Sequence, residues 1–190
     1  MKVVFAAMLT WVLLTPLGAL AQADRAASRF LQTLPTELQV QMPAGHLAGR
    51  ARFNVWGFHV YDAALWVAPG FKAQNFEDHA FALELTYGRR FTSQDIAKRS
   101  VVEMARQRPI PMDQLGLWER QLQAALPDVQ AGDRLTGIYK PGHGAQLLVN
   151  GKPHKTLSDL QLSKMFFGIW LAEATSEPAL RRDLIAQVSP

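Results

Sequence analysis

An almost continuous apolar segment at residues 49–67 carries the polar side chains of Arg50, Arg52, Tyr61 and Asp62. Burying such groups costs free energy unless they are neutralised or hydrogen bonded, so each of them needs a partner in the fold or a ligand. A guanidinium group binds a carboxylate through two parallel hydrogen bonds, and a phenol adds one more donor. Arg52 and Tyr61 therefore predict a site for a carboxylate whose tail lies between apolar walls.

Each of these candidates also has a purely structural interpretation. Arg50 and Arg52 alternate along a predicted strand and share one face, which is either solvated or turned into a cleft. Tyr61 either contacts a ligand or buries a hydroxyl that bonds to the backbone, and Tyr87 either contacts a ligand or packs in the core. Asp62 faces away from Tyr61, and we expect it to hold a turn or to pair with an arginine rather than to act as a base.

Other kinds of chemistry have little support in the sequence. The five histidines are scattered without close pairing, which argues against a metal site. No serine lies in a Gly-x-Ser-x-Gly pattern, and the chain has no cysteine. The Gly142-x-Gly144 pair lacks a third glycine and a following helix, so it predicts a hairpin turn rather than a phosphate site. We therefore expect no cofactor and no metal.

The apolar patterns predict a single α+β domain in which helices cover one face of a large antiparallel sheet. Strict alternation makes residues 81–87 the clearest strand. Further strands are expected at 49–56, 58–67, 134–140, 144–149 and 152–155. Helices are expected to follow capping boxes at Thr92–Asp95 and Ser158–Gln161, and to span residues 113–126 and 176–188.

Residues 1–23 read as a signal peptide rather than as part of the fold. Lys2 precedes an apolar segment, a break at Pro16 and Gly18, and the small-x-small cleavage motif Ala21-Gln22-Ala23. Cleavage after Ala23 leaves a domain of residues 24–190 with 19 Lys plus Arg and 16 Asp plus Glu. This excess forms no basic stripe, so we expect no nucleic-acid partner. The expected product is periplasmic or secreted, has no disulfide, and keeps no stable membrane anchor after cleavage.

Five segments together resemble one protein family over nearly all of residues 40–188. They are Val60-Tyr61-Asp62-Ala63-x-Leu65, Leu83-x-Leu85-x-Tyr87, Phe91-x-x-x-Asp95-Ile96, Pro127-Asp128-Val129-x-x-Gly132-Asp133-x-Leu135-Thr136, and Phe166-Phe167-Gly168-Ile169-Trp170-Leu171 followed by Thr175-Ser176-Glu177-Pro178. In this order they resemble bacterial chalcone isomerase-like proteins. The resemblance implies an open-faced β-sandwich, with a ligand cleft between a large antiparallel sheet and a helical layer.

The resemblance does not carry over the chemistry of the plant isomerases. In those enzymes a cleft arginine assists attack of a chalcone phenolate on its own enone, while threonine, tyrosine and asparagine residues place the substrate. At the matching positions this chain has Tyr61, Ile96, Glu103 and Ile169. These departures remove hydrogen-bonding groups that the cyclisation uses.

The non-catalytic branch of the family, the plastid fatty-acid-binding proteins, holds a fatty-acid carboxylate with an arginine and a tyrosine. The pair Arg52 and Tyr61 resembles that arrangement, with Arg50 and Tyr87 as further ligand contacts. We therefore expect an exported, non-catalytic binder of a fatty acid or a similar amphipathic carboxylate. The alternatives are an intramolecular lyase of the chalcone isomerase type and a periplasmic protein-interaction domain whose partners the sequence does not name.

Overall fold

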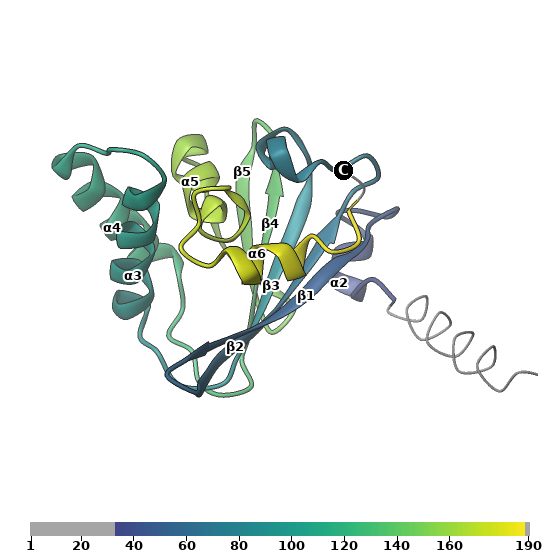
Figure 1. Cartoon of the computed structure of the whole chain (residues 1–190), viewed down its shortest axis with the longest axis horizontal. Helices are drawn as coiled ribbons and strands as arrows, with labels where there is room; N and C mark the ends of the chain where they lie inside the picture. The colour runs from purple at the N-terminus through teal and green to yellow at the C-terminus, as the bar shows by residue number, and fades with distance from the viewer. Residues whose placement is uncertain (1–32, 189–190) are drawn as a thin grey trace, which may run out of the picture. The chain divides into compact units, whose positions relative to one another are not determined.

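The computed structural model describes residues 33–188, and its centre is one six-stranded antiparallel sheet in which the strands follow chain order (Figure 1). The strands are β1 (His46–Val55), β2 (Phe58–Val67), β3 (Phe81–Tyr87), β4 (Arg134–Lys140), β5 (Gly144–Val149) and β6 (Lys152–Leu157). The predicted signal peptide, residues 1–23, lies outside the described residues. The predicted α+β class is confirmed, and each predicted strand is present.

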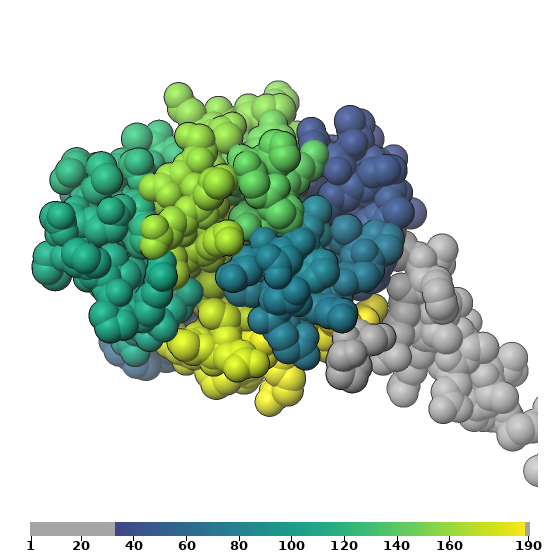
Figure 2. Space-filling view, turned by 90° about the horizontal axis from the view of Figure 1, so that it is seen from above, coloured from purple at the N-terminus to yellow at the C-terminus, as the bar shows by residue number. Residues whose placement is uncertain are grey.

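The helices are α2 (Thr36–Gln39), the 3-10 helix η1 (Ala73–Asp78), α3 (Ser93–Gln107), α4 (Met112–Ala125), α5 (Leu160–Leu171) and α6 (Pro178–Leu184). Helix α3 packs on α4 and α5, α5 contacts β5 and β6, and α6 lies along β1 and β2. Seen from above, the teal α3 and α4, the yellow-green α5 and the yellow α6 adjoin one another (Figure 2). No helix among residues 33–188 is long and apolar enough to cross a membrane.

Side-chain alternation separates two faces of the sheet. The face beneath the helices carries the main core, which includes Leu65, Phe81, Leu83 and Leu147, all 3% exposed or less. The other face carries a smaller apolar cluster around Leu38 of α2. A position on β1 or β2 therefore belongs either to the helical side or to the α2 side, and this choice decides which residues can form a site.

The helix ends follow local hydrogen bonding. The predicted capping box of α3 is confirmed, because Asp95 N–H donates to Thr92 Oγ1 at 3.1 Å and Thr92 N–H donates to Asp95 Oδ2 at 3.2 Å. For α5 the predicted cap at Ser158 is wrong by one residue. Asp159 caps it instead, accepting from Leu162 N–H at 2.9 Å.

Helix α6 is shorter than the predicted helix of residues 176–188. It ends at Leu184, and the following chain turns back toward the sheet, where Gln187 N–H donates to the carbonyl of Ala48 at 2.8 Å. A backbone bond to β1 takes the place of further helical bonds.

Candidate ligand-binding site

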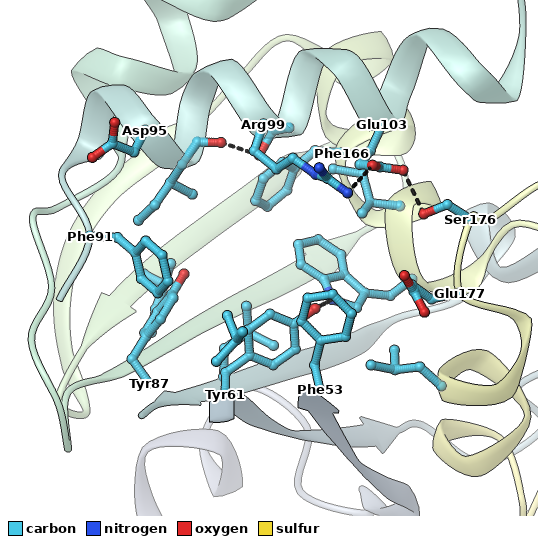
Figure 3. Close-up of a pocket in the computed structure, with 18 residues that line it drawn as sticks. Phe53, Tyr61, Tyr87, Phe91, Asp95, Arg99, Glu103, Phe166, Ser176 and Glu177 are labelled. Atoms are coloured by element: carbon cyan, nitrogen blue, oxygen red, sulfur yellow. Dashed lines mark hydrogen bonds and ion pairs between the residues drawn. The ribbon is translucent and has the colours of Figure 1, made fainter. Parts of the chain in front are cut away.

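A cavity of about 240 Å³ lies between one end of the sheet and the helical layer (Figure 3). It is larger than the cavity of roughly 150 Å³ that binds benzene in an engineered protein, and slightly smaller than the roughly 300–1,000 Å³ of pockets for drug-sized ligands. Its size suits one ring or a short acyl chain. The lining comes from β1–β4, α3, α5, α6 and the segments beside them: Phe53, Val60, Tyr61, Leu85, Tyr87, Phe91, Asp95, Ile96, Arg99, Ser100, Glu103, Leu135, Phe166, Ile169, Trp170, Ser176, Glu177 and Leu180.

Aromatic rings form the sheet side of the cavity. Ring centroids are 5.1 Å apart for Phe53 and Tyr61, 6.2 Å for Tyr61 and Tyr87, and 5.9 Å for Tyr87 and Phe91. Phe53, Tyr61 and Tyr87 reach the same face because sheet register places Phe53 opposite Tyr61 and Tyr61 opposite Tyr87. These rings form an apolar surface on which a ligand can make stacked or edge-to-face contacts.

Both predicted tyrosines line the cavity, but their hydroxyls differ. Trp170 Nε1–H donates to Tyr61 Oη at 3.0 Å, which fixes the Tyr61 ring against α5. Tyr87 Oη has no hydrogen-bond partner among residues 33–188, although the Tyr87 residue is only 5% exposed. Burial raises the pKa of both phenols well above the ordinary value, so both are neutral donors at physiological pH.

The α3 side of the cavity is polar because residues at helical spacing share one face of that helix. Asp95, Arg99 and Glu103 follow one another at intervals of four, and Figure 3 shows all three along the cavity edge. The Asp95 carboxylate is committed to the α3 cap, and its hydrogen bonds from Thr92 lower its pKa. Arg99 and Glu103 are therefore the charged groups of α3 that can respond to a ligand.

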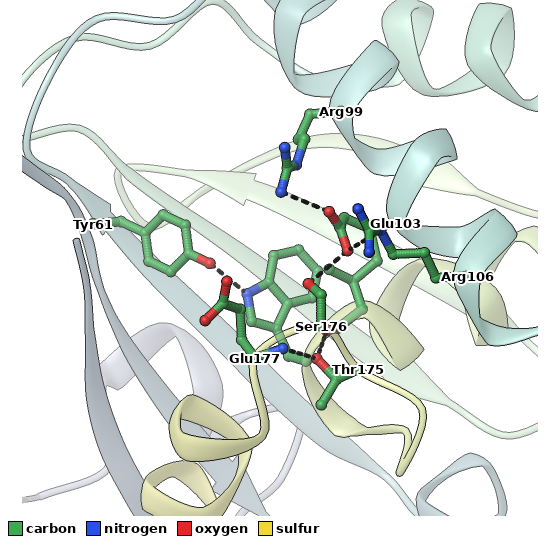
Figure 4. A network of polar contacts seen from close by, with 9 residues as sticks. Tyr61, Arg99, Glu103, Arg106, Thr175, Ser176 and Glu177 are labelled. Atoms are coloured by element: carbon green, nitrogen blue, oxygen red, sulfur yellow. Dashed lines mark hydrogen bonds and ion pairs between the residues drawn. The ribbon is translucent and has the colours of Figure 1, made fainter. Parts of the chain in front are cut away.

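Glu103 is buried, at 6% exposed, and lies between two arginines (Figure 4). Arg99 Nη2 is 2.6 Å from Glu103 Oε1, and Arg106 Nε is 3.5 Å from Oε2. Ser176 Oγ also donates to Oε2 at 2.7 Å. The carboxylate would keep Arg106 and Ser176 as partners if Arg99 turned to another anion. Glu177 adds a third carboxylate to the lining, on the segment before α6, so an anionic head group fits best beside Arg99 of α3.

The prediction that Arg52 meets Tyr61 in the cleft is wrong. Arg52 lies opposite Asp62 on the α2 side of the sheet, where its Nε donates to Asp62 Oδ1 at 2.7 Å. This bond lowers the pKa of Asp62 and raises that of Arg52. The expectation that Asp62 pairs with an arginine is confirmed.

A β-bulge explains why Arg52 and Tyr61 lie on opposite faces. The hairpin turn of two residues, Trp56 and Gly57, pairs Val55 with Phe58, and a regular ladder from that turn would place Arg52 opposite Tyr61. The register shifts between Asn54 and Phe53, with Val60 as the extra residue, so Phe53 pairs with Tyr61 instead. One residue of shift exchanges the two faces.

The prediction that Arg50 contacts a ligand beside Tyr61 is also wrong. Arg50 shares the α2 side with Arg52, as its alternation implies, and its guanidinium lies 5.8 Å from the centre of the Trp66 ring. Arg50 therefore makes a cation–π contact with Trp66 on the α2 side of the sheet. Within residues 33–188, no group of three or more histidine, aspartate or glutamate side chains could hold a metal ion.

Sequence reasoning missed Arg99 and the polar cluster around Glu103. The signal was present, because Asp95, Arg99 and Glu103 recur at a four-residue spacing beside Ile96 and Ser100. That pattern normally marks a solvated helix face with ion pairs, so it does not by itself point to a cavity.

A model of the chalcone isomerase-like family matches residues 31–186. The chain belongs to the chalcone isomerase-like family. Among solved structures, a fatty-acid binding protein of Arabidopsis thaliana has a TM-score of 0.56, with 11% sequence identity over 75% of this chain and 87% of that one. At this identity the likeness concerns the fold alone. No curated protein sequence matches the chain.

The cavity occupies the place that the family resemblance assigns to the cleft. All four positions at which this chalcone isomerase-like chain departs from the plant isomerases line it: Tyr61, Ile96, Glu103 and Ile169. Two of these side chains are aliphatic, so that part of the wall offers no hydrogen bond to a substrate. The family fold is thus present around a cavity of different chemistry.

Proposed function

We propose that this protein is a non-catalytic binder of a small amphipathic carboxylate, with the apolar part among the aromatic rings and the head group at Arg99. The observation that carries the proposal is the juxtaposition of an open apolar cavity with the Arg99–Glu103 pair at its edge. The fatty-acid binding protein of similar fold supports a lipid-like ligand class. The site differs from the one first expected, because Arg99 replaces Arg52.

The ionisable groups of the lining favour binding over catalysis. General acid–base catalysis needs a group whose pKa lies near the working pH. Tyr61 and Tyr87 have raised pKa values, Asp95 is held in a helix cap, and Glu103 is held by Ser176 and Arg99. The two tyrosines, Asp95 and Glu103 are therefore fixed partners rather than poised proton carriers, and Glu177 is the remaining acid of the lining.

Arg99 is suited to exchange partners. Its side chain is 65% exposed while that of Glu103 is 6% exposed, so Arg99 can move without opening the core. An incoming carboxylate would replace the Glu103 carboxylate on the guanidinium, and Arg106 would continue to neutralise Glu103. The Tyr87 hydroxyl, which has no partner among the described residues, is a further donor inside the cavity.

Titration with octanoate tests this head-group assignment. Octanoate carries a carboxylate on a chain short enough for a cavity of about 240 Å³. Arg99→Gln should weaken binding by about tenfold to 150-fold, the scale of a hydrogen bond to a charged group of roughly 1.5–3 kcal/mol. Isothermal titration calorimetry gives both the affinity and the stoichiometry.

Arg52→Gln is the matched control, because it also replaces an arginine by glutamine, but on the face of the sheet that does not line the cavity. We expect its affinity for octanoate to equal that of the parent. Equal loss in both variants, or no loss in Arg99→Gln, contradicts the assignment. Titration with octanol separates the two parts of the proposal. If octanol binds as tightly as octanoate, the cavity is a site for apolar chains, but Arg99 does not recognise a carboxylate.

We also propose that the protein works outside the cytoplasm after export. The support is the pattern of residues 1–23 and the complete lack of cysteine, which suits a domain that needs no disulfide in an oxidising compartment. The test is the intact mass of the chain recovered from a periplasmic fraction. Cleavage after Ala23 is the expected result, and an uncleaved chain in the cytoplasm would contradict it.

A further inference from the structure

The tip of the β1–β2 hairpin carries the most exposed large hydrophobic residue of the described chain. Trp56 is 95% exposed, Phe58 is 66% exposed and Val55 is 38% exposed. The three other tryptophans within residues 33–188 are buried, at 7% exposed or less. In Figure 1 this turn lies at the lower end of the sheet, beyond the end of α3.

The backbone conformation at residue 56 does not favour a tryptophan, so folding alone does not explain the choice of this residue. It has a φ of 50° and precedes Gly57 with a φ of 82°, the conformation of a type I′ turn. Asparagine, aspartate or glycine is preferred at the first of these positions, and a bulky side chain with positive φ is strained. A strained tryptophan in full contact with water lowers stability and solubility at once, so its presence calls for an external partner.

Cations lie beside this tip. Residues 88–90 run along the start of β2, where Gly88 N–H donates to the Val60 carbonyl at 2.8 Å, and both Arg89 and Arg90 are exposed. Arg52 and Asp62 neutralise one another nearby. The carboxylates of Asp128 and Asp133 belong to the loop on the far side of β3, where they accept hydrogen bonds from backbone N–H groups.

We propose that the hairpin tip docks on a phospholipid bilayer, with Trp56 and Phe58 in the interfacial region and Arg89 and Arg90 on the lipid phosphates. Tryptophan is the side chain most favoured at that depth, because its ring is apolar and its N–H remains hydrated. Two exposed arginines next to an aromatic tip match the phosphate layer just outside the acyl chains. The contact is peripheral, and it stands whether or not the cavity binds a carboxylate.

Docking at this place would bring the cavity to the membrane. Phe53 and Val60, which lie a few residues from the turn on either strand, line the cavity. Phe91, one residue beyond Arg90, lines it as well. The same hairpin thus joins the bilayer surface to the aromatic wall, which gives a lipid-derived molecule a short path between them.

The test is co-sedimentation with vesicles of phosphatidylglycerol and phosphatidylethanolamine, using chains that begin at Asp24, with this start verified by mass spectrometry, so that the apolar residues of the leader are absent. Trp56→Ser should lower the partition constant about tenfold or more, the loss expected when a buried aromatic ring is removed. Met112→Ser is the matched control, because Met112 is 82% exposed on α4 and should not matter.

Trp56→Asn gives a second readout that a structural role would not produce. Asn-Gly suits the type I′ turn, so this variant should melt at a higher temperature than the parent while losing vesicle binding. In chains that begin at Asp24, which lack Trp11, brominated lipids should quench the fluorescence of Trp56, because the other three tryptophans are buried. Arg89→Gln with Arg90→Gln should weaken binding, whereas Lys152→Gln with Lys155→Gln, on exposed positions of β6, should not.

Several results would overturn the proposal. One is parent protein that fails to bind vesicles; another is equal binding by Trp56→Ser and the parent, or an equal loss in Met112→Ser. A dimer that sedimentation velocity detects in the parent and not in Trp56→Ser, without vesicle binding, would assign the tip to a second copy of the chain instead.

Discussion

At the scale of single residues, the two cavity tyrosines have different roles, and Tyr61 is partly buried whereas Tyr87 is buried. Tyr61 accepts a hydrogen bond from the buried Trp170 indole, whereas Tyr87 presents its hydroxyl to the cavity. The first hydroxyl therefore holds the wall together, and the second is available to a ligand.

Replacing each tyrosine by phenylalanine should separate these duties. Tyr61→Phe leaves the Trp170 N–H without its acceptor and should lower the free energy of unfolding by about 1–3 kcal/mol. Tyr87→Phe removes a hydroxyl with no described partner and should change stability by less than about 0.5 kcal/mol. Urea denaturation of both variants measures the difference, and an equal effect of the two would contradict the hydrogen-bond assignment.

Residue types identified two tyrosines of the cavity together with an arginine, Arg52, that lies outside it. Tyr61 and Tyr87 could be placed on the inner face from alternation alone. Arg52 could not, because the extra residue Val60 shifts the ladder and no sequence rule locates such a bulge. Arg99 was hidden because an arginine four residues from a glutamate is ordinary on an exposed helix.

At the scale of elements, Asp159 joins two helices. It caps α5, and its Oδ2 accepts the indole N–H of the buried Trp118 of α4 at 3.1 Å. A single carboxylate therefore satisfies a helix terminus and a buried donor together.

Asp159→Ala should consequently cost more than loss of an isolated cap. We expect a decrease of about 2–4 kcal/mol in the free energy of unfolding, from roughly 1 kcal/mol for the cap plus roughly 1–3 kcal/mol for the unpaired indole. Thr92→Ala, which removes the α3 cap, should cost about 0.5–2 kcal/mol. Asp159→Asn keeps one acceptor oxygen and replaces the other by an NH2 donor, so it should keep the α5 cap, lose the bond from the Trp118 indole and cost about 1–3 kcal/mol. Stability equal to the parent in that variant would argue against the dual role.

Elements were predictable where local chemistry specifies them. Alternation located β3, and glycine and proline signals located the turns between β4, β5 and β6. The cap at Asp159 and the early end of α6 depend on Trp118 and on the Ala48 carbonyl, which are distant in sequence. Tertiary partners therefore moved boundaries that propensity alone would place elsewhere.

At the scale of the whole molecule, all three tyrosines of the chain should resist ionisation. Burial raises the pKa of Tyr61, Tyr87 and Tyr139, so the folded protein holds these protons more tightly than the unfolded chain does. Their contribution to stability is complete below the ordinary tyrosine pKa of about 10 and decreases as pH rises above it. Absorbance at alkaline pH should show tyrosinate forming together with unfolding; half-ionised tyrosines in a folded protein near pH 10 would contradict this.

The cavity itself could not be derived from sequence. Its lining comes from four strands and three helices with their flanking segments, and its volume depends on how their side chains fill the space between the layers. The stripe of Phe166, Ile169 and Trp170 would pack as ordinary core if α3 lay closer to the sheet. The expectation of a cleft came from the family resemblance, whereas the residues that line it are known only from the structure.

The most direct test of the ligand site is an NMR titration of the indole N–H signals with octanoate. Trp170 lies in the cavity wall, whereas Trp66 lies on the opposite face of the sheet beside Arg50. We predict that octanoate shifts the Trp170 indole signal, that the Trp66 and Trp118 signals stay in place, and that Arg99→Gln suppresses the shift. Movement of Trp66 alone, or of no indole at saturating octanoate, would contradict the assignment of the cavity.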